Sequence, residues 1–301
     1  MNSADQAFQR GKNEIVGDLI PLHYHYQMLQ DGDRVEGFKK AIELLVPTGA
    51  KVLELGAGTG ILSYFAAQKA SYVRCVEKIP ELAQKARELF KLNPTPTPVE
   101  VVQADALSYL PPEPVDVVIC EMLHSALLRE KQLEVISSFK KRYRAQFGDL
   151  PLLFLPEATV LGVEPIQRNF EFAGFHAPIV CFQSPGPAPR TLPLGNASVY
   201  ATIQYAQDFP TEFHFDQEMI ISHTGTLNAF QFITSNALAI LVDQKCTLNW
   251  MNQNIIFPIK NPLTVSPGDQ IRLRFSYKAG DEIHVLQESI QVDFLKREPR
   301  S

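Results

Sequence analysis

A glycine-rich turn between an apolar strand and a helix constrains the fold of this chain more than any other feature. The stretch VLELGAGTGILSYFAA (52–67) places Gly56, Gly58 and Gly60 after a strand-like run and before a helical pattern. Glycines at such a turn let the backbone approach a ligand closely. The pattern therefore predicts a strand that ends at a ligand site in an open parallel sheet.

The sequence around this turn alternates strand and helix patterns, which predicts a doubly wound, Rossmann-like sheet with helices on both faces. Strand-like apolar runs stand at 51–56, 72–78, 99–105 and 115–121. Helical patterns stand at 35–45, 60–70, 80–93 and 129–147. After about residue 150 the chain is rich in β-branched and aromatic residues punctuated by Pro and Gly, which predicts an all-β unit, a barrel or sandwich. We expect two domains, 1–155 and 156–301.

Composition limits the classes of partner and the compartment. The net charge of −5 gives no strong basic field, so we expect no nucleic-acid partner. No apolar run reaches transmembrane length, so we expect no membrane partner. The four cysteines are far apart and the histidines form no HExxH, so we expect no metal site. Free thiols favour a reducing, cytoplasmic location.

Three acidic residues stand at or near the carboxyl ends of three predicted strands, where an open sheet binds its ligand. Glu54 stands two residues before the first glycine, Glu77 ends the next strand, and Asp105 follows the third. An acid at the position of Glu54 would repel a pyrophosphate but suits an amino group. Glu77 suits ribose hydroxyls, and Asp105 suits an adenine amino group. The set favours S-adenosyl-L-methionine, with S-adenosyl-L-homocysteine as product, over a dinucleotide.

A pair of glutamates brackets the stretch EMLHSALLRE, which follows the fourth predicted strand. Glu121 and Glu130 lie nine residues apart (121 to 130). Both could be solvated, and an acid at 130 also suits the first turn of a helix. Alternatively, both carboxylates face one pocket and hold a cation, and a guanidinium suits paired carboxylates because its planar fork donates bidentate hydrogen bonds.

These motifs together resemble those of the protein arginine N-methyltransferases, which are class I S-adenosylmethionine-dependent methyltransferases with a C-terminal β-barrel. EMLHSALLRE resembles the double-glutamate hairpin of that family, which implies that Glu121 and Glu130 hold the guanidinium of a protein substrate. MLQDGDR (28–34) resembles the N-terminal segment that packs over the cofactor, which implies that Arg34 binds the methionine carboxylate. His25 matches the histidine that precedes this segment.

The later part of the chain extends the resemblance and also departs from it. LFLPEATV (153–160) resembles the step from the Rossmann unit to the barrel. TLNW (247–250) keeps the family's tryptophan as Trp250, a substrate-pocket residue, but has Asn249 where the family has histidine. The family's dimerisation arm is reduced to 165–175 and its neighbours, which leaves the oligomeric state open.

The resemblance implies an enzyme that methylates arginine in proteins. The departures keep two alternatives open. One is a methyltransferase for another acceptor, such as a side-chain amide or a small metabolite. The other is a scaffold that binds the cofactor without catalysis.

Overall fold

The computed structural model describes residues 22–186 and 188–296, and the chain divides into two compact units that are interleaved in sequence. The α/β unit combines Met1–Met122, Glu134–Pro156 and Leu238–Leu248. The β unit combines Leu123–Leu133, Glu157–Ala237 and Asn249–Ser301. Residues 123–133 thus belong to the β unit although they precede position 155, and the division into domains at 155/156 stays a prediction.

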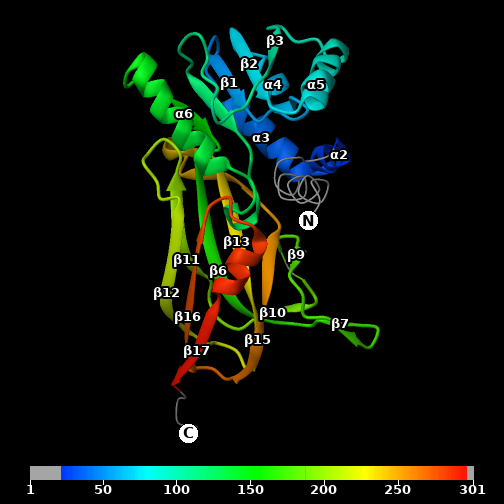
Figure 1. The fold of residues 1–301 in the computed structure, drawn as a ribbon, viewed down its shortest axis with the longest axis vertical. Helices are drawn as coiled ribbons and strands as arrows, with labels where there is room; N and C mark the ends of the chain where they lie inside the picture. Colours follow the sequence, from blue (N-terminus) through cyan, green and yellow to red (C-terminus); the bar gives the residue numbers. More distant parts are fainter. Residues whose placement is uncertain (1–21, 187, 297–301) are drawn as a thin grey trace, which may run out of the picture. The chain divides into compact units, whose positions relative to one another are not determined.

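The α/β unit is built on five parallel strands in the order β3-β2-β1-β4-β5 (Figure 1). The strands are β1 (Lys51–Leu55), β2 (Tyr72–Glu77), β3 (Val99–Gln103), β4 (Val117–Cys120) and β5 (Leu153–Leu155). Strands β1 and β4 are apolar and buried along most of their length, as expected for the centre of a parallel sheet. The order places the carboxyl ends of β1, β2 and β4 side by side, which confirms the predicted Rossmann-like sheet.

Within the described residues five helices accompany the sheet; four of them overlap the predicted helical ranges, and the first lies before those ranges. They are α2 (Leu22–Gln30), α3 (Gly32–Leu45), α4 (Ile61–Ala66), α5 (Pro80–Leu92) and α6 (Gln132–Phe147). The Asp31 side chain caps α3 by accepting from Arg34 N at 3.0 Å. Helix α6 begins three residues later than its pattern, because Arg129 has a φ of 61° that a helix cannot contain.

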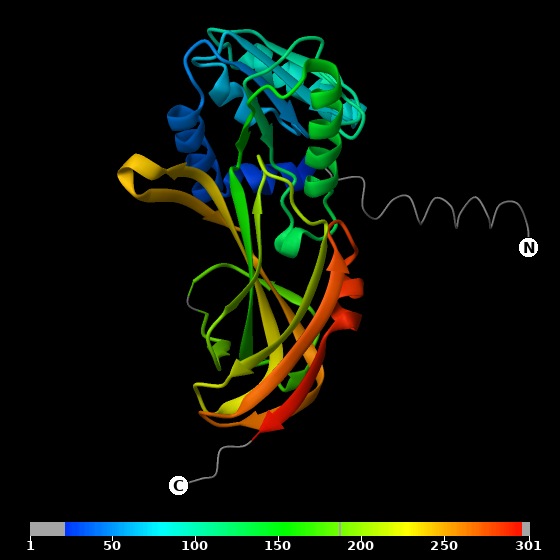
Figure 2. The same cartoon turned by 90° about the vertical axis from the view of Figure 1, so that its left-hand side faces the viewer.

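The β unit is formed by antiparallel strands, which confirms the predicted change of fold class. One sheet has the order β10-β6-β13-β15-β9, with β11 on β6 and β14 on β13, and a second has the order β12-β16-β17. The strands of this unit are drawn in colours from green through yellow to red in Figure 2. Their bounds are β6 (Ala158–Arg168), β9 (Cys181–Gln183), β10 (Thr191–Pro193), β11 (Ser198–Gln204), β12 (Glu212–Ile220), β13 (Gly225–Leu241), β14 (Cys246–Met251), β15 (Asn254–Val265), β16 (Gln270–Lys278) and β17 (Gln291–Lys296). Helix α7 (Ile283–Ser289) connects β16 and β17.

An aromatic core holds the two antiparallel sheets together. Tyr200 of β11 lies edge-on to Phe275 of β16, with ring centroids 5.1 Å apart, and to Phe232 of β13 at 6.0 Å. The alternating burial of β12 turns Phe213 and Phe215 toward the same core. The core therefore draws on strands from both sheets and from widely separated parts of the chain.

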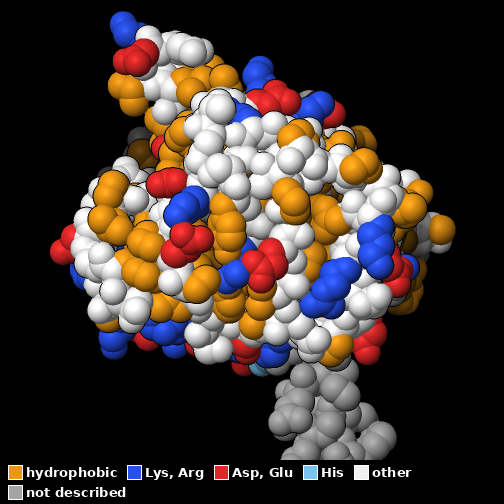
Figure 3. Space-filling model, turned by 90° about the horizontal axis from the view of Figure 1, so that it is seen from above, with side chains coloured by type: hydrophobic (Ala, Val, Ile, Leu, Met, Phe, Trp, Pro, Cys, Tyr) orange, Lys and Arg blue, Asp and Glu red, His pale blue; other side chains and the backbone are white. Residues whose placement is uncertain are grey.

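The segment expected to be a reduced arm forms a small hairpin of β7 (Glu171–Phe172) and β8 (Phe175–His176). Phe175 is 71% exposed and Phe172 is 47% exposed. On the face drawn in Figure 3, Lys and Arg side chains alternate with acidic and apolar ones and form no continuous basic patch.

Within 22–186 and 188–296, no helix is long and apolar enough to cross a membrane. In the same ranges no three His, Cys, Asp or Glu side chains are grouped as metal ligands.

Candidate active site

The turn that follows β1 has a backbone conformation that residues other than glycine rarely adopt. Gly56, Gly58 and Gly60 have φ values of 77°, 54° and 79°. A Cβ at Gly58 would lie 2.7 Å from the His25 ring, so α2 is packed directly on the turn. A Cβ at Gly60 would lie 2.6 Å from the Phe90 ring. Glycine is therefore required here by backbone conformation and by close packing.

Glu77, at the end of β2, fastens the glycine turn to the neighbouring strand. Its Oε2 accepts from Gly58 N and its Oε1 from Ile79 N, both at 2.8 Å. The side chain is buried. Two backbone donors stabilise the ionised carboxylate and fix its orientation, so that its remaining lone pairs can accept from a diol.

Glu54, in β1, is a buried carboxyl that faces the first turn of α4. Its Oε2 accepts from Ser63 N at 3.0 Å and from the Ser63 hydroxyl. Burial raises the pKa of Glu54 to about 8, against the two bonds from Ser63, and the nearby charge of Glu121 adds to the increase. Glu54 is thus a carboxyl whose charge responds to a cation placed beside it.

Arg34 and Glu121 form a buried ion pair within the α/β unit. Arg34 Nη2 donates to Glu121 Oε2, and Nη1 donates to the Met28 carbonyl at 3.3 Å. Burial lowers the pKa of Arg34, but the attraction of Glu121 and their hydrogen bond outweigh it and raise that pKa. The sequence therefore brings the predicted carboxylate-binding arginine and the first predicted clamp residue into direct contact.

Asp105 lies beyond β3 and is held from two sides. Its Oδ1 accepts from Leu107 N at 2.9 Å, and its Oδ2 lies 3.3 Å from Lys78 Nζ. Lys78 directly follows Glu77, so the ends of β2 and β3 are joined by this ion pair. The Asp105 side chain is 37% exposed, which leaves it accessible to a ligand.

The remaining predicted residues belong to the β unit. Glu130 is half-buried and directly follows a turn in which its N–H donates to the Leu128 carbonyl at 2.6 Å. Trp250 lies in β14 and is half-buried, and Asn249 beside it is exposed. TLNW is therefore part of a strand in this chain.

The α/β-unit residues fit the cofactor that the sequence predicts. Two buried carboxylates, Glu54 and Glu77, stand at adjacent strand ends and suit the amino and hydroxyl donors of S-adenosylmethionine. Arg34 Nε is buried and has no hydrogen-bond partner among the described residues, so the guanidinium retains a donor for a carboxylate. The set offers no cation cluster for a pyrophosphate.

Ser63 and Lys78 were not predicted from the sequence as site residues. Ser63 stands three residues after Gly60, and a hydroxyl in the first turn after a glycine loop is the pattern that could have identified it. Lys78 follows a strand-end acid and has no comparable pattern.

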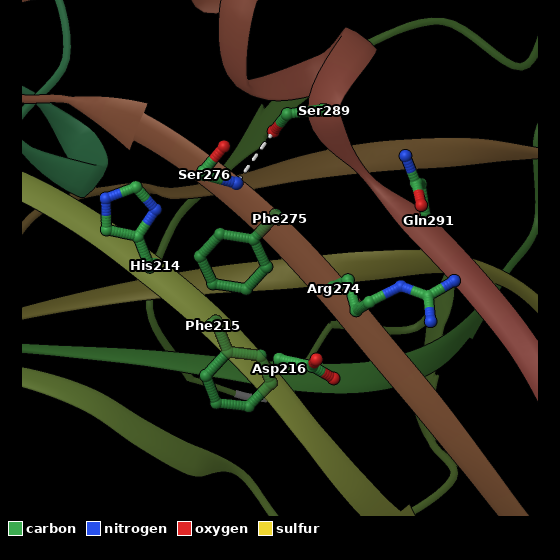
Figure 4. Close-up of a pocket in the computed structure, with 8 residues that line it drawn as sticks. All are labelled: His214, Phe215, Asp216, Arg274, Phe275, Ser276, Ser289 and Gln291. Atoms are coloured by element: carbon green, nitrogen blue, oxygen red, sulfur yellow. Dashed lines mark hydrogen bonds between the residues drawn. The ribbon is translucent and has the colours of Figure 1, made fainter.

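A depression of about 360 Å³ lies on the β12–β16–β17 sheet, away in sequence from all of these residues (Figure 4). Its charged side chains are paired: Asp216 accepts from Arg272, and Arg274 donates to Asp293. It is lined by none of the residues predicted to bind cofactor or acceptor.

Comparison with protein families gives one matching family model, described as a methyltransferase domain, over residues 52–145. An uncharacterized protein of Methanothermobacter thermautotrophicus is 30% identical over 270 residues, which cover 89% of this chain and 97% of that protein. Protein arginine N-methyltransferase 2 of Xenopus tropicalis is 30% identical over 164 residues, which cover 53% of this chain and 37% of that protein.

Among solved structures, the Trypanosoma brucei PRMT1 enzyme-prozyme heterotetrameric complex with AdoHcy is similar with a TM-score of 0.68. The match is 18% identical and covers 83% of this chain and 86% of that one. At this identity the likeness shows the fold, and it extends over both the parallel and the antiparallel parts.

Proposed function

Because this chain belongs to the class I S-adenosylmethionine-dependent methyltransferases that resemble the protein arginine methyltransferases, we propose that it methylates a guanidinium nitrogen of arginine in a protein substrate. The cofactor supplies an electrophilic methyl group together with its own leaving group, so the reaction needs no metal ion. What the chain must supply is orientation and charge.

We assign the cofactor to the residues at the strand ends of the α/β unit. Arg34 would bind the carboxylate of the methionine part, and Glu54 its amino group. Glu77 would accept from the ribose hydroxyls and Asp105 from the adenine amino group. The buried carboxylates of Glu54 and Glu77 and the remaining donor of Arg34 support this assignment.

The acceptor would be held by Glu121 and Glu130. One observation carries this proposal: the buried Glu121 carboxylate already binds a guanidinium, that of Arg34, through Oε2. We propose that Oε1 accepts from the substrate arginine and that Glu130 provides the second carboxylate. Two carboxylates concentrate the positive charge on the nitrogens they contact, so the third nitrogen can attack the methyl group as the bond between methyl carbon and sulfur breaks, and the proton that this nitrogen loses would pass to one of the two carboxylates.

The test is label transfer from methyl-labelled S-adenosylmethionine to an arginine-rich protein, followed by mass spectrometry of the product. We expect methylarginine from the parent and a loss of about 100-fold or more in rate for Glu121→Gln and Glu130→Gln. The exposed Glu212→Gln serves as a charge-matched control in the β unit and should retain the rate. Methylarginine formation at parental rates by both clamp variants would remove the guanidinium clamp.

A second candidate keeps the cofactor and changes the acceptor to a side-chain amide or a small metabolite. The observation that favours it is Asn249, an exposed amide where the related family has histidine. Mass spectrometry of the same reaction separates the two candidates, because methylasparagine or a methylated metabolite would replace methylarginine.

We further propose that the protein works in the cytoplasm. None of the four cysteines is in a disulfide, and Cys75 and Cys120 are buried, which suits a reducing compartment.

A further inference from the structure

The turn that precedes Glu130 is held in a conformation that its own residues disfavour. Ala126, Leu127 and Arg129 have φ values of 56°, 54° and 61°, in the left-handed region that favours glycine. Ala126, Leu127 and Leu128 are buried. Local preference does not produce this shape, so contacts from the rest of the β unit must impose it.

Two side chains from distant parts of the β unit supply those contacts. The Ala126 N–H donates to Thr234 Oγ1 of β13 at 2.7 Å. Asn252 Nδ2, just beyond β14, donates to the Leu123 carbonyl at 2.7 Å. Thr234 is 0% exposed and Asn252 is 7% exposed, so no solvent can replace these bonds if they are lost.

A buried polar network fixes the Asn252 side chain and joins the backbone of Asn252 to that of Thr234. Asn236 Nδ2 donates to Asn252 Oδ1 at 2.7 Å, and Thr159 Oγ1 donates to Asn236 Oδ1 at 2.8 Å. The Asn252 N–H also donates to the Thr234 carbonyl at 3.1 Å. Every polar atom of the Asn252 side chain is therefore committed, which sets the orientation of its amide.

The other end of the turn is bound by the loop after β16. Gly280 N donates to the Leu127 carbonyl and Arg129 N donates to the Asp281 carbonyl, each at 2.9 Å. The Tyr277 hydroxyl donates to the Ala126 carbonyl at 2.9 Å. The backbone of residues 123–129 is therefore hydrogen-bonded on both sides immediately before Glu130.

We infer that Thr234 and Asn252 are positioning residues that set the place of the Glu130 carboxylate through the backbone of residues 123–129. This inference rests on the proposed function of Glu130 as the second clamp. Burying the Thr234 hydroxyl and the Asn252 amide among apolar residues costs free energy unless both groups form hydrogen bonds. Here both groups are hydrogen-bonded to the backbone of the turn.

The experiment compares Thr234→Val, which keeps the shape and loses the hydroxyl, with Thr234→Ser, which keeps the hydroxyl. We expect Thr234→Val to lower kcat/KM for the arginine acceptor by about 10- to 100-fold, with the Kd for S-adenosylhomocysteine unchanged within about twofold. Thr234→Ser should restore most of the rate. Asn252→Leu should behave like Thr234→Val.

Gln231→Met is the matched control, since Gln231 is buried in the same strand but bonds Gln183 and Glu164 instead of the turn. It should lower Tm by a similar amount without changing kcat/KM. Equal kinetic losses in Gln231→Met and Thr234→Val, or no rescue by serine, would overturn the inference.

A second measurement does not depend on the acceptor. Amide exchange of the peptide covering 123–130, followed by mass spectrometry, should be faster in Thr234→Val and unchanged in Gln231→Met. Unchanged exchange in Thr234→Val overturns the inference for any acceptor. A parent protein that forms no methylarginine contradicts the proposed function instead, so the two failures are distinct.

Discussion

The Arg34 guanidinium and the Glu121 carboxylate are bonded to each other in the buried interior of the α/β unit, 87 residues apart in the chain. One of these groups is assigned to the cofactor and the other to the acceptor. Their contact couples the two ends of the proposed reaction, because the position of one charge depends on the other.

We predict that the two members of this pair differ in their effect on cofactor binding. Arg34→Ala should raise the Kd for S-adenosylhomocysteine at least about tenfold, because it removes the guanidinium that donates to the carboxylate of the ligand. Glu121→Gln keeps an amide oxygen that can accept from Arg34, so it should leave that Kd within about twofold while it lowers the rate of methyl transfer about 100-fold or more. Isothermal titration calorimetry and the label-transfer assay measure the two effects. Lys39→Ala, on the same helix but exposed, is the control. Equal losses of cofactor affinity in both variants would contradict the division of roles.

Breaking the same pair should also affect folding. Removal of either partner leaves a buried charge without its counter-ion, so we expect Arg34→Ala to lower the free energy of unfolding by about 3–5 kcal/mol. Lys39→Ala removes an ion pair with a 4.0 Å separation at the surface and should change it by less than about 1 kcal/mol. Urea denaturation followed by circular dichroism checks both values. A loss in Arg34→Ala as small as in the control would mean that the pair does not stabilise the fold.

The raised pKa of Glu54 predicts a specific pH dependence of stability. In the unfolded chain this carboxyl titrates near 4.5, and in the folded protein near 8. Between these values the folded state binds one proton more than the unfolded state, so stability falls as pH rises through this window. Relative to Glu54→Gln, which cannot ionise, the parent should lose stability between pH 4.5 and 8 and change little outside it. Denaturation at intervals across pH 4 to 9 gives this difference, and a difference independent of pH would refute the shift.

The same carboxyl predicts a pH dependence of cofactor binding. A cationic amino group next to Glu54 favours its ionised form, so binding should release a proton below about pH 8. Calorimetry in two buffers with different ionisation enthalpies should therefore give different apparent binding enthalpies at pH 7. In Glu54→Gln the apparent binding enthalpies in the two buffers should differ less, because residue 54 can no longer release a proton.

The contact between Gly58 and His25 predicts a partial rescue. Gly58→Ala introduces a Cβ 2.7 Å from the His25 ring at a φ of 54°, so it should destabilise the protein and weaken cofactor binding. His25→Ala in the same chain relieves the clash but not the backbone strain. The double variant should recover part of the stability, as a double-mutant cycle of thermal unfolding would show. Strict additivity of the two changes would mean that α2 does not pack on the turn as described.

The sequence was sufficient for the order of elements in the α/β unit, because strand and helix patterns there are local and strongly periodic. The acids at strand ends followed from that order, since parallel strands present their carboxyl ends at one edge. Glu54, Glu77 and Asp105 could be placed in this way. Ser63 could have been found from its place in the first turn after the glycine loop, whereas nothing in the local pattern of Lys78 distinguishes it from other residues near a loop.

What the sequence could not show depends on contacts between distant positions. The Arg34–Glu121 pair is one case, and the bond from Ala126 to Thr234 is another, over 108 residues. The late start of α6 has the same origin, because the left-handed Arg129 is stabilised by the Asp281 carbonyl and not by its neighbours in sequence. The roles of all the predicted site residues, those of the α/β unit as well as Glu130 and Trp250, stay predictions.

The left-handed turn at 126–129 also says something about how this enzyme could change over time. Hydrogen bonds to a hydroxyl group on β13 and from an amide group after β14 maintain its conformation, while the turn itself contains no glycine. A single substitution in a remote strand could therefore change the conformation of the loop during evolution, while the sequence of the loop itself stays the same. A comparison of the loop sequences of related proteins would not detect such a change in the loop.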